Sequence, residues 1–137
     1  MIPTEFQEQE ALCQYLDLKK IRYFSIPNEM GLSMLNRYVA IRMGAKLKKI
    51  GKKRGVPDLA VFLPNKILFI EMKRTKGSTI SKEQKEWINY LNTELSYAGA
   101  SICKGWQEAK SYIEDEIKIE NIKKVKKGDL KCQQQKN

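Results

Sequence analysis

The chain has 137 residues, the length of one domain, and its 26 Lys and Arg against 16 Asp and Glu give a net charge of +10. So large a positive charge predicts a polyanionic partner, nucleic acid first and an anionic membrane surface second. The sequence contains no histidine, which excludes Ser-His-Asp hydrolases, histidine-bound metal nucleases and phospholipase-D-like nucleases. Any catalysis must therefore use carboxylates, Lys, Tyr, Cys or a metal ion with oxygen ligands.

The three cysteines, Cys13, Cys103 and Cys132, are far apart and form no CxxC pair. This pattern argues against a disulfide scaffold or a zinc ribbon and favours a reducing, intracellular compartment such as the cytoplasm. We expect no transmembrane helix, because the sequence lacks an apolar run of about 18 residues. The polar, acidic start, MIPTEFQEQE, is not typical of a signal peptide.

The first half of the chain predicts a helix, a short strand and a second helix. Residues 4–18 have helical apolar spacing, and Thr4 and Gln7 predict a capping box at the start. Residues 21–26 resemble a strand that ends at Pro27. Residues 32–50 have helical spacing weakened by Gly44, and a basic, glycine-containing loop follows at 51–57.

The second half predicts a hairpin covered by helices. Residues 58–63 and 66–73 read as strands around a Pro64-Asn65 turn, and both of their faces are apolar, so we expect an α/β fold with helices on both sides of the sheet. A helix from Ser81 to about Leu95, a strand at 97–103 and a helix at 106–117 should follow. We expect a domain over residues 1–117 and a basic, loosely ordered tail over 118–137.

The distribution of charge points to a site on the hairpin. No acidic residue occurs from Met30 to Pro57, and the next two carboxylates are Asp58 and Glu71. With a two-residue turn, paired positions sum to 129, which places these two acids opposite each other with Cβ atoms about 4.5–5.5 Å apart. A divalent cation would relieve their repulsion, and Lys73 shares the face of Glu71. A structural ion pair at the sheet end is the alternative.

At these residues the sequence resembles a known family. Val56-Pro57-Asp58 followed by Ile70-Glu71-Met72-Lys73 looks like the PD…ExK signature of the PD-(D/E)xK nuclease superfamily. The segments GVPDL, FIEMKRTKG and SKEQKEW are similar to the VRR-NUC family of small phage and repair nucleases. The resemblance extends from the first helix to about Ile117. It implies a restriction-endonuclease-like core, a central mixed β-sheet flanked by helices on both faces.

The resemblance also implies roles for individual residues. Asp58 and Glu71 would bind Mg²⁺ or Mn²⁺, Lys73 would orient or help deprotonate the attacking water, and Gln84 would position water or phosphate. A capping box with Ser81 is an equal alternative for Gln84. The family carries a glutamate on the first helix, where Glu5, Glu8 and Glu10 compete and the choice between Glu5 and Glu8 stays open. Asn28 resembles the residue that precedes the family's basic segment, and a turn role suits it equally.

The implied activity is metal-dependent endonucleolytic hydrolysis of DNA, in phage replication, recombination or repair, with nicked or junction DNA among the expected substrates. Small members of the superfamily commonly act as homodimers, which we also expect here. A basic segment would bind backbone phosphates through Lys46, Lys48, Lys49, Lys52, Lys53 and Arg54. Two alternatives stay open: a non-catalytic basic nucleic-acid-binding module, and a nuclease subunit that works with a helicase or another partner of a replication or restriction complex.

Overall fold

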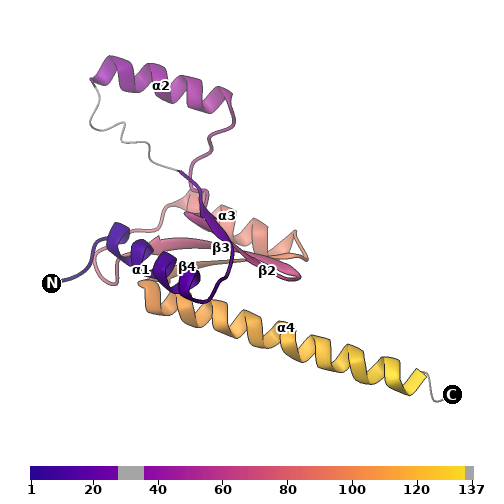
Figure 1. Ribbon diagram of the computed structural model, residues 1–137. Helices are drawn as coiled ribbons and strands as arrows, with labels where there is room; N and C mark the ends of the chain where they lie inside the picture. Colours follow the sequence, from indigo (N-terminus) through magenta and orange to yellow (C-terminus); the bar gives the residue numbers. More distant parts are fainter. Residues whose placement is uncertain (28–35, 135–137) are drawn as a thin grey trace.

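A computed structural model describes residues 1–27 and 36–134. A four-stranded sheet lies between helices on its two faces, so the expected α/β architecture is confirmed (Figure 1). The elements in chain order are α1 (Glu5–Leu18), β1 (Tyr23–Ser25), α2 (Arg37–Lys49), β2 (Leu59–Leu63), β3 (Lys66–Lys73), α3 (Lys82–Thr93), β4 (Ala98–Lys104) and α4 (Trp106–Gln134).

The sheet is mixed and has the strand order β1-β2-β3-β4. The first three strands are antiparallel, and β4 runs parallel to β3 after the crossover through α3. In the hairpin Leu63 pairs with Lys66 and Leu59 pairs with Ile70, so every pair has numbers that sum to 129. The predicted register is therefore confirmed, and it fixes which side chains of β2 and β3 share a face.

The core lies between one face of the sheet and two helices. Alternate residues of β2 and β3 point to the side covered by α1 and α4, while α3 packs on the other side against β3 and β4 (Figure 1). β2 and β3 both contribute fully buried apolar side chains, which join others from α1 and α4: Leu59, Val61, Leu68, Ile70, Met72, Leu12, Leu16 and Ile113.

Two helices begin with the capping boxes that the sequence predicts. The Thr4 side chain accepts from the Gln7 backbone amide, and the Gln7 side chain accepts from the Thr4 amide. Ser81 and Gln84 make the same reciprocal pair at the start of α3. Each pair satisfies two backbone donors that would otherwise lack a partner at a helix start, which fixes where α1 and α3 begin.

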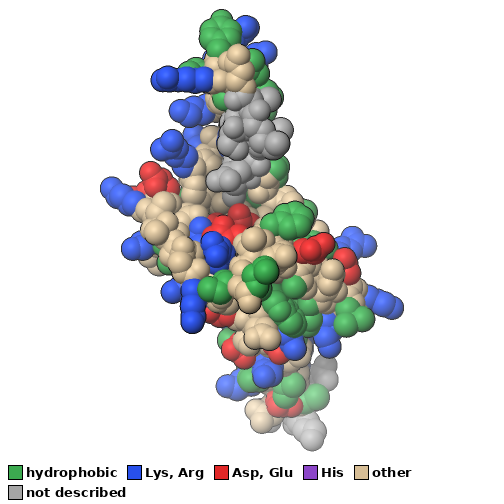
Figure 2. Space-filling model, turned by 90° about the vertical axis from the view of Figure 1, so that its left-hand side faces the viewer, with side chains coloured by type: hydrophobic (Ala, Val, Ile, Leu, Met, Phe, Trp, Pro, Cys, Tyr) green, Lys and Arg blue, Asp and Glu red, His purple; other side chains and the backbone are tan. Residues whose placement is uncertain are grey.

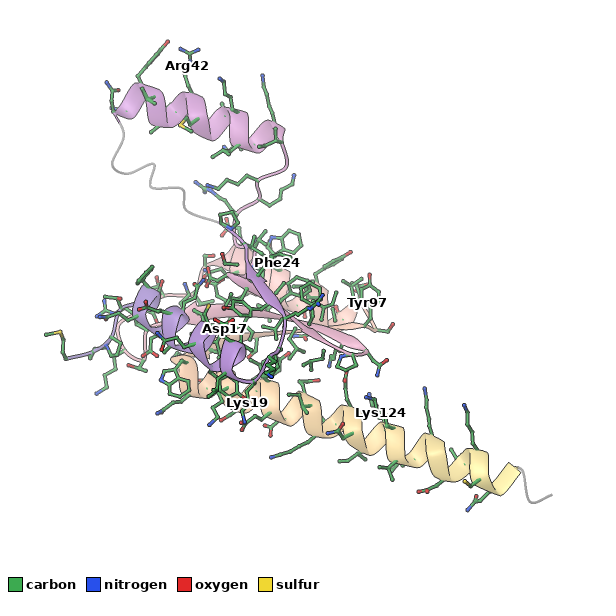
Figure 3. The ribbon with its side chains drawn as sticks, viewed as in Figure 1. Asp17, Lys19, Phe24, Arg42, Tyr97 and Lys124 are labelled. Carbon is green, nitrogen blue, oxygen red and sulfur yellow. The ribbon has the colours of Figure 1, made fainter. Side chains whose placement is uncertain are left out.

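The second helix stands off from the sheet. α2 projects beyond the core (Figure 1) and contains no buried residue. Its apolar Val39, Ile41 and Met43 are 42%, 62% and 37% exposed, and Arg42, which stacks over Tyr38, projects from the helix on the side away from the sheet (Figure 3). Apolar spacing here does not produce a core helix. The expected helix start at residue 32 and Asn28 lie outside the described residues.

The last helix is longer than the sequence suggests. We expected it to end near Ile117, and this is wrong, because α4 continues to Gln134 and its C-terminal end extends past the sheet (Figure 1). Glu120, which is 9% exposed, accepts from the Asn65 amide at the hairpin turn and ties the helix to the sheet past the expected end. The separation into a domain and a basic tail stays a prediction. Within the described ranges, no helix is long and apolar enough to cross a membrane.

Candidate active site

A cleft of about 690 Å³ opens at the end of the hairpin, beneath α2. The antiparallel register brings the start of β2 beside the end of β3, and the first turns of α1 and α3 reach the same place. Acidic and basic side chains gather on this side of the molecule, below the projecting helix α2 (Figure 2). The residues that line the cleft include Glu5, Phe6, Gln9, Asp58, Glu71, Lys73 and Gln84.

Glu71 lies in the floor of the cleft and is only 4% exposed. Its Oε1 atom is 3.1 Å from Lys73 Nζ and also accepts a hydrogen bond from Gln84 Nε2. Burial and the nearby Asp58 carboxylate nevertheless raise the pKa of Glu71 to about 7, against the lowering effect of Lys73. The neighbouring groups therefore compensate the negative charge of Glu71 only in part. A bound cation would stabilise the charged form of this carboxylate.

Asp58 immediately precedes β2 and is fixed by the backbone on both sides. Its Oδ2 atom accepts a 2.7 Å hydrogen bond from the Met72 amide of β3, and its carbonyl accepts from the Ile26 amide after β1. Continuing the hairpin register from Leu59 places Asp58 on the face of Glu71. The two acids thus share one cleft, and a backbone amide of β3, the strand that carries Glu71, fixes the side chain of Asp58.

The structure separates the two candidate acids of α1. Glu5 lines the cleft, and its Oε1 atom is 3.9 Å from Lys73 Nζ. Glu8 is buried at 4% exposure and its Oε2 atom accepts from the Trp106 amide at 2.8 Å, at the start of α4. Glu5 therefore belongs to the cleft and Glu8 to the anchoring of α4, while Glu10 is exposed.

Gln84 forms the predicted capping box and also contacts Glu71, while a role in positioning water or phosphate stays a prediction. Its Oε1 atom accepts from the Ser81 amide at 2.9 Å, which completes the capping box. Its Nε2 atom donates to Glu71 Oε1. One amide side chain can make both contacts because its acceptor and donor atoms point in different directions. The first turn of α3 is thereby tied to the acidic centre.

Part of the basic segment reaches the cleft. Lys48 of α2 lines it together with Lys52, Lys53 and Arg54, which belong to the connector, residues 50–57. Lys46 and Lys49 are exposed on α2 but do not line it. Lys and Arg side chains, drawn in blue, lie along α2 and the connector in the view of Figure 2. The cleft thus has cations at its mouth and carboxylates on its floor.

The end of the connector is locked against α3. Trp87 Nε1 donates to the Arg54 carbonyl at 3.0 Å. Gly55 has φ +75°, and a Cβ atom added there would lie 2.5 Å from the Glu83 carbonyl carbon. Only glycine allows both this backbone conformation and this approach. The end of the connector, which carries cations of the cleft mouth, is therefore held in place beside the acidic floor.

The donor set fits Mg²⁺ or Mn²⁺. Among the described residues no group of three or more Cys, Asp and Glu side chains is arranged to hold a metal ion, so the candidate centre offers two carboxylates, Asp58 and Glu71. Magnesium sites commonly use one or two carboxylates and complete their octahedron with waters and substrate phosphates. Both donors to Glu71 act on Oε1, so a cation that used Oε2 would displace neither.

Sequence reasoning missed several residues that line the cleft, among them Phe6 and Gln9 of α1. Gln9 follows Glu5 by one helical turn, so the spacing from Glu5 could have indicated it. Phe6 lacked such a signal, because an apolar residue in the first turn of an amphipathic helix is usually assigned to the core. Its position became visible only when the orientation of α1 on the sheet was known.

Comparison with known proteins gives two findings and one negative result. The family model of the VRR-NUC domain matches residues 4–107. A solved structure described as a VRR_NUC domain protein is 25% identical, with a TM-score of 0.66, over 85% of this chain and 89% of that one. A search of curated proteins found no match. The family match covers most of the chain, and the fold neighbour agrees with a restriction-endonuclease-like core, so this chain belongs to the VRR-NUC domain family, whose domain is of the nuclease type.

Proposed function

We propose that this protein is an endonuclease that hydrolyses DNA phosphodiester bonds with a divalent cation, Mg²⁺ or Mn²⁺. The observation that carries the proposal is the convergence of two carboxylates, Asp58 and Glu71, with the Lys73 ammonium group in one cleft. The family match supports the nuclease chemistry, and the cations at the mouth support a polyanionic substrate.

Asp58 and Glu71 would hold the cation, which when bound supplies Lewis-acid polarisation of the phosphate and a more acidic water. The Met72 amide keeps the Asp58 carboxylate aimed into the cleft. Gln84 orients Glu71 through Oε1, so its contribution is positioning.

The Lys73 ammonium group lies beside the two carboxylates, where it would be next to the reacting groups. Its Nζ atom lies between Glu71 at 3.1 Å and Glu5 at 3.9 Å, and the residue is 8% exposed. An ammonium group held in this way can orient the attacking water and stabilise the charge that develops on the phosphate. Glu5 holds the second side of Lys73 and limits the directions in which the ammonium group can point.

The biological setting belongs to the proposal as well. A role in phage replication, recombination or repair fits the small, basic domain, and a homodimer would supply the second centre that a double-strand cut needs. Gel filtration tests the dimer directly, because a dimer would elute near twice the 15.9 kDa of the chain.

The proposal is tested by nicking of supercoiled plasmid with Mg²⁺, with Mn²⁺ and with EDTA. Wild type should nick only with metal, and Asp58→Ala and Lys73→Ala should lose the activity while they still bind DNA. Lys124→Ala on the distant part of α4 is the matched lysine control and should cut normally. If all the proteins bind DNA and none cuts, the chain is a binding module or needs a partner subunit, and the proposal is wrong.

A further inference from the structure

The first turn of α1 presents an aromatic ring at the mouth of the cleft. Phe6 is 75% exposed and lines the cleft beside Glu5. It lies two positions before the buried Glu8, which is about 200° around a helix of 3.6 residues per turn, so it points away from the core. Its exposure therefore follows from the fold, and packing within the described protein gives no reason for a phenylalanine here.

The cations that line the same cleft come from other elements. Lys48 of α2 and Lys52, Lys53 and Arg54 of the connector supply positive charge, while α1 contributes Phe6 and Gln9. Proteins that hold a single nucleic-acid strand combine a positively charged groove, which follows the backbone, with aromatic side chains on which bases stack. This cleft contains both components.

The size of the cleft limits what can enter. Its volume of about 690 Å³ is within the roughly 300–1,000 Å³ of small-molecule sites, which is enough room for a phosphodiester and the adjoining nucleotides of one strand. A scissile phosphate placed at the acidic floor would have its neighbouring phosphates against the cations. In a nucleotide the base and the phosphate are attached to different positions of the sugar. With the phosphates against the cations, the adjacent base would therefore point toward α1, where Phe6 lies.

We propose that Phe6 stacks on an unpaired base next to the scissile phosphate and so makes the enzyme favour DNA whose bases are unpaired at the cut. This inference rests on the proposed nuclease function and deepens it. Phe6 at the edge of the cleft then favours DNA with unpaired bases, whereas the carboxylates on the floor serve the hydrolysis. No base-specific contact is involved, since every base has a face on which a phenyl ring can stack.

The experiment measures binding without cleavage. Full-length protein in Ca²⁺ or EDTA is titrated into two DNAs that differ only in whether a central 2-aminopurine is unpaired or paired. Phe6→Ala should weaken binding of the unpaired DNA by about 5- to 150-fold, the range that loss of one stacked base gives, and should abolish the fluorescence quenching. Binding of the fully paired DNA should stay unchanged.

Matched variants separate stacking from other effects. Leu18→Ala removes a residue of α1 that is 79% exposed and far from the cleft, and it should behave as wild type. Phe6→Trp should retain the preference for the unpaired DNA, and Phe6→Leu should lose it because leucine has bulk but no aromatic face. The inference is overturned if Phe6→Ala or Phe6→Leu binds both DNAs as wild type does.

The wild type and the Phe6→Ala variant also test this inference independently of the proposed function. A wild type that cuts, with a Phe6→Ala variant that binds and quenches like it, would leave the nuclease function standing and overturn the stacking role. A wild type that never cuts, but whose quenching disappears in Phe6→Ala, would remove the nuclease function and keep the stacking role as a strand-binding site.

Discussion

Glu8 Oε2 accepts a 2.8 Å hydrogen bond from the backbone amide of Trp106, the first residue of α4. A buried carboxylate of α1 therefore anchors the start of the last helix, where backbone N–H groups lack helical partners and the helix dipole favours negative charge. Glu5, three residues earlier, faces the cleft instead. Two acids within one turn of α1 thus have separate tasks, one for the fold and one for the site.

This division predicts opposite phenotypes for the two acids. Glu8→Ala should lower the free energy of unfolding by about 1–3 kcal/mol, because it leaves the Trp106 amide without its acceptor, whereas Glu8→Gln retains an acceptor oxygen and should cost less. Glu5→Gln should leave the melting temperature nearly unchanged and reduce plasmid nicking. Urea unfolding together with nicking measures both. Equal losses of stability for Glu5→Gln and Glu8→Ala would contradict the assignment.

The raised pKa of Glu71 predicts a pH dependence of stability in the metal-free protein. The pKa is about 7 in the fold against 4.5 for the ordinary group, so between these pH values the folded state binds more protons than the unfolded chain. The free energy of unfolding should therefore decrease as pH rises from 4.5 to 7, by on the order of 2–3 kcal/mol, and the contribution should level off above pH 7. In Glu71→Gln this part of the slope should be missing. Urea unfolding in EDTA at several pH values measures it.

A second consequence of this pKa concerns metal binding. Protons and cations compete for the Glu71 carboxylate, because a metal ligand must be deprotonated. The increase in melting temperature on addition of Mn²⁺ should therefore be larger at pH 8 than at pH 6. Glu71→Gln and Asp58→Asn should show little increase at either pH. An increase of the same size in wild type and in both variants would mean that Mn²⁺ binds elsewhere.

The lysines that line the cleft should set the salt dependence of DNA binding. Lys48→Ala and Lys52→Ala should each reduce the slope of log affinity against log salt concentration by about 0.7–0.9, the value for one lost phosphate contact. Lys124→Ala, a lysine on α4 far from the cleft, is the control and should leave the slope unchanged. Fluorescence anisotropy at several salt concentrations measures the slope. A change in Lys124→Ala as large as in Lys48→Ala would show that the binding surface lies elsewhere.

The lock between the connector and α3 predicts a costly glycine substitution. Gly55→Ala combines positive φ with a Cβ atom 2.5–2.7 Å from atoms of Glu83 and Gln84, and we expect a loss of about 2–4 kcal/mol of stability. Gly128→Ala in α4, where a Cβ atom would meet nothing within 4 Å, is the control and should stabilise its helix slightly. Thermal unfolding compares the two. A Gly55→Ala protein as stable as wild type would mean that the connector is not locked at this point.

Local chemistry made the hairpin and the helix starts predictable from the sequence. A two-residue turn fixed the pairing of Leu59 with Ile70 and hence the shared face of Asp58 and Glu71. Thr4 and Ser81 each predicted the start of a helix, because a capping box depends on only four consecutive residues. Such features need no knowledge of the tertiary structure, which explains why they could be stated in advance.

Features that depend on distant contacts could not be predicted. The choice between Glu5 and Glu8 required the position of Trp106, almost a hundred residues away, and the persistence of α4 beyond Ile117 required the contact of Glu120 with the hairpin turn. Val39 and Met43 have core-like spacing, yet α2 lies off the sheet. Apolar periodicity indicates a helix but does not indicate what covers it.

The strands β1 and β2 are direct neighbours in the sheet, although α2 and the connector lie between them in sequence. Their pairing is held by their own backbone bonds, such as the one from the Ile26 amide to the Asp58 carbonyl. α2 thus belongs to an insertion between two paired strands, and it contributes no buried residue to the core below it. Under the proposed nuclease function, changes on the exposed faces of α2 would alter how the substrate is held and leave the carboxylate centre of Asp58 and Glu71 in place.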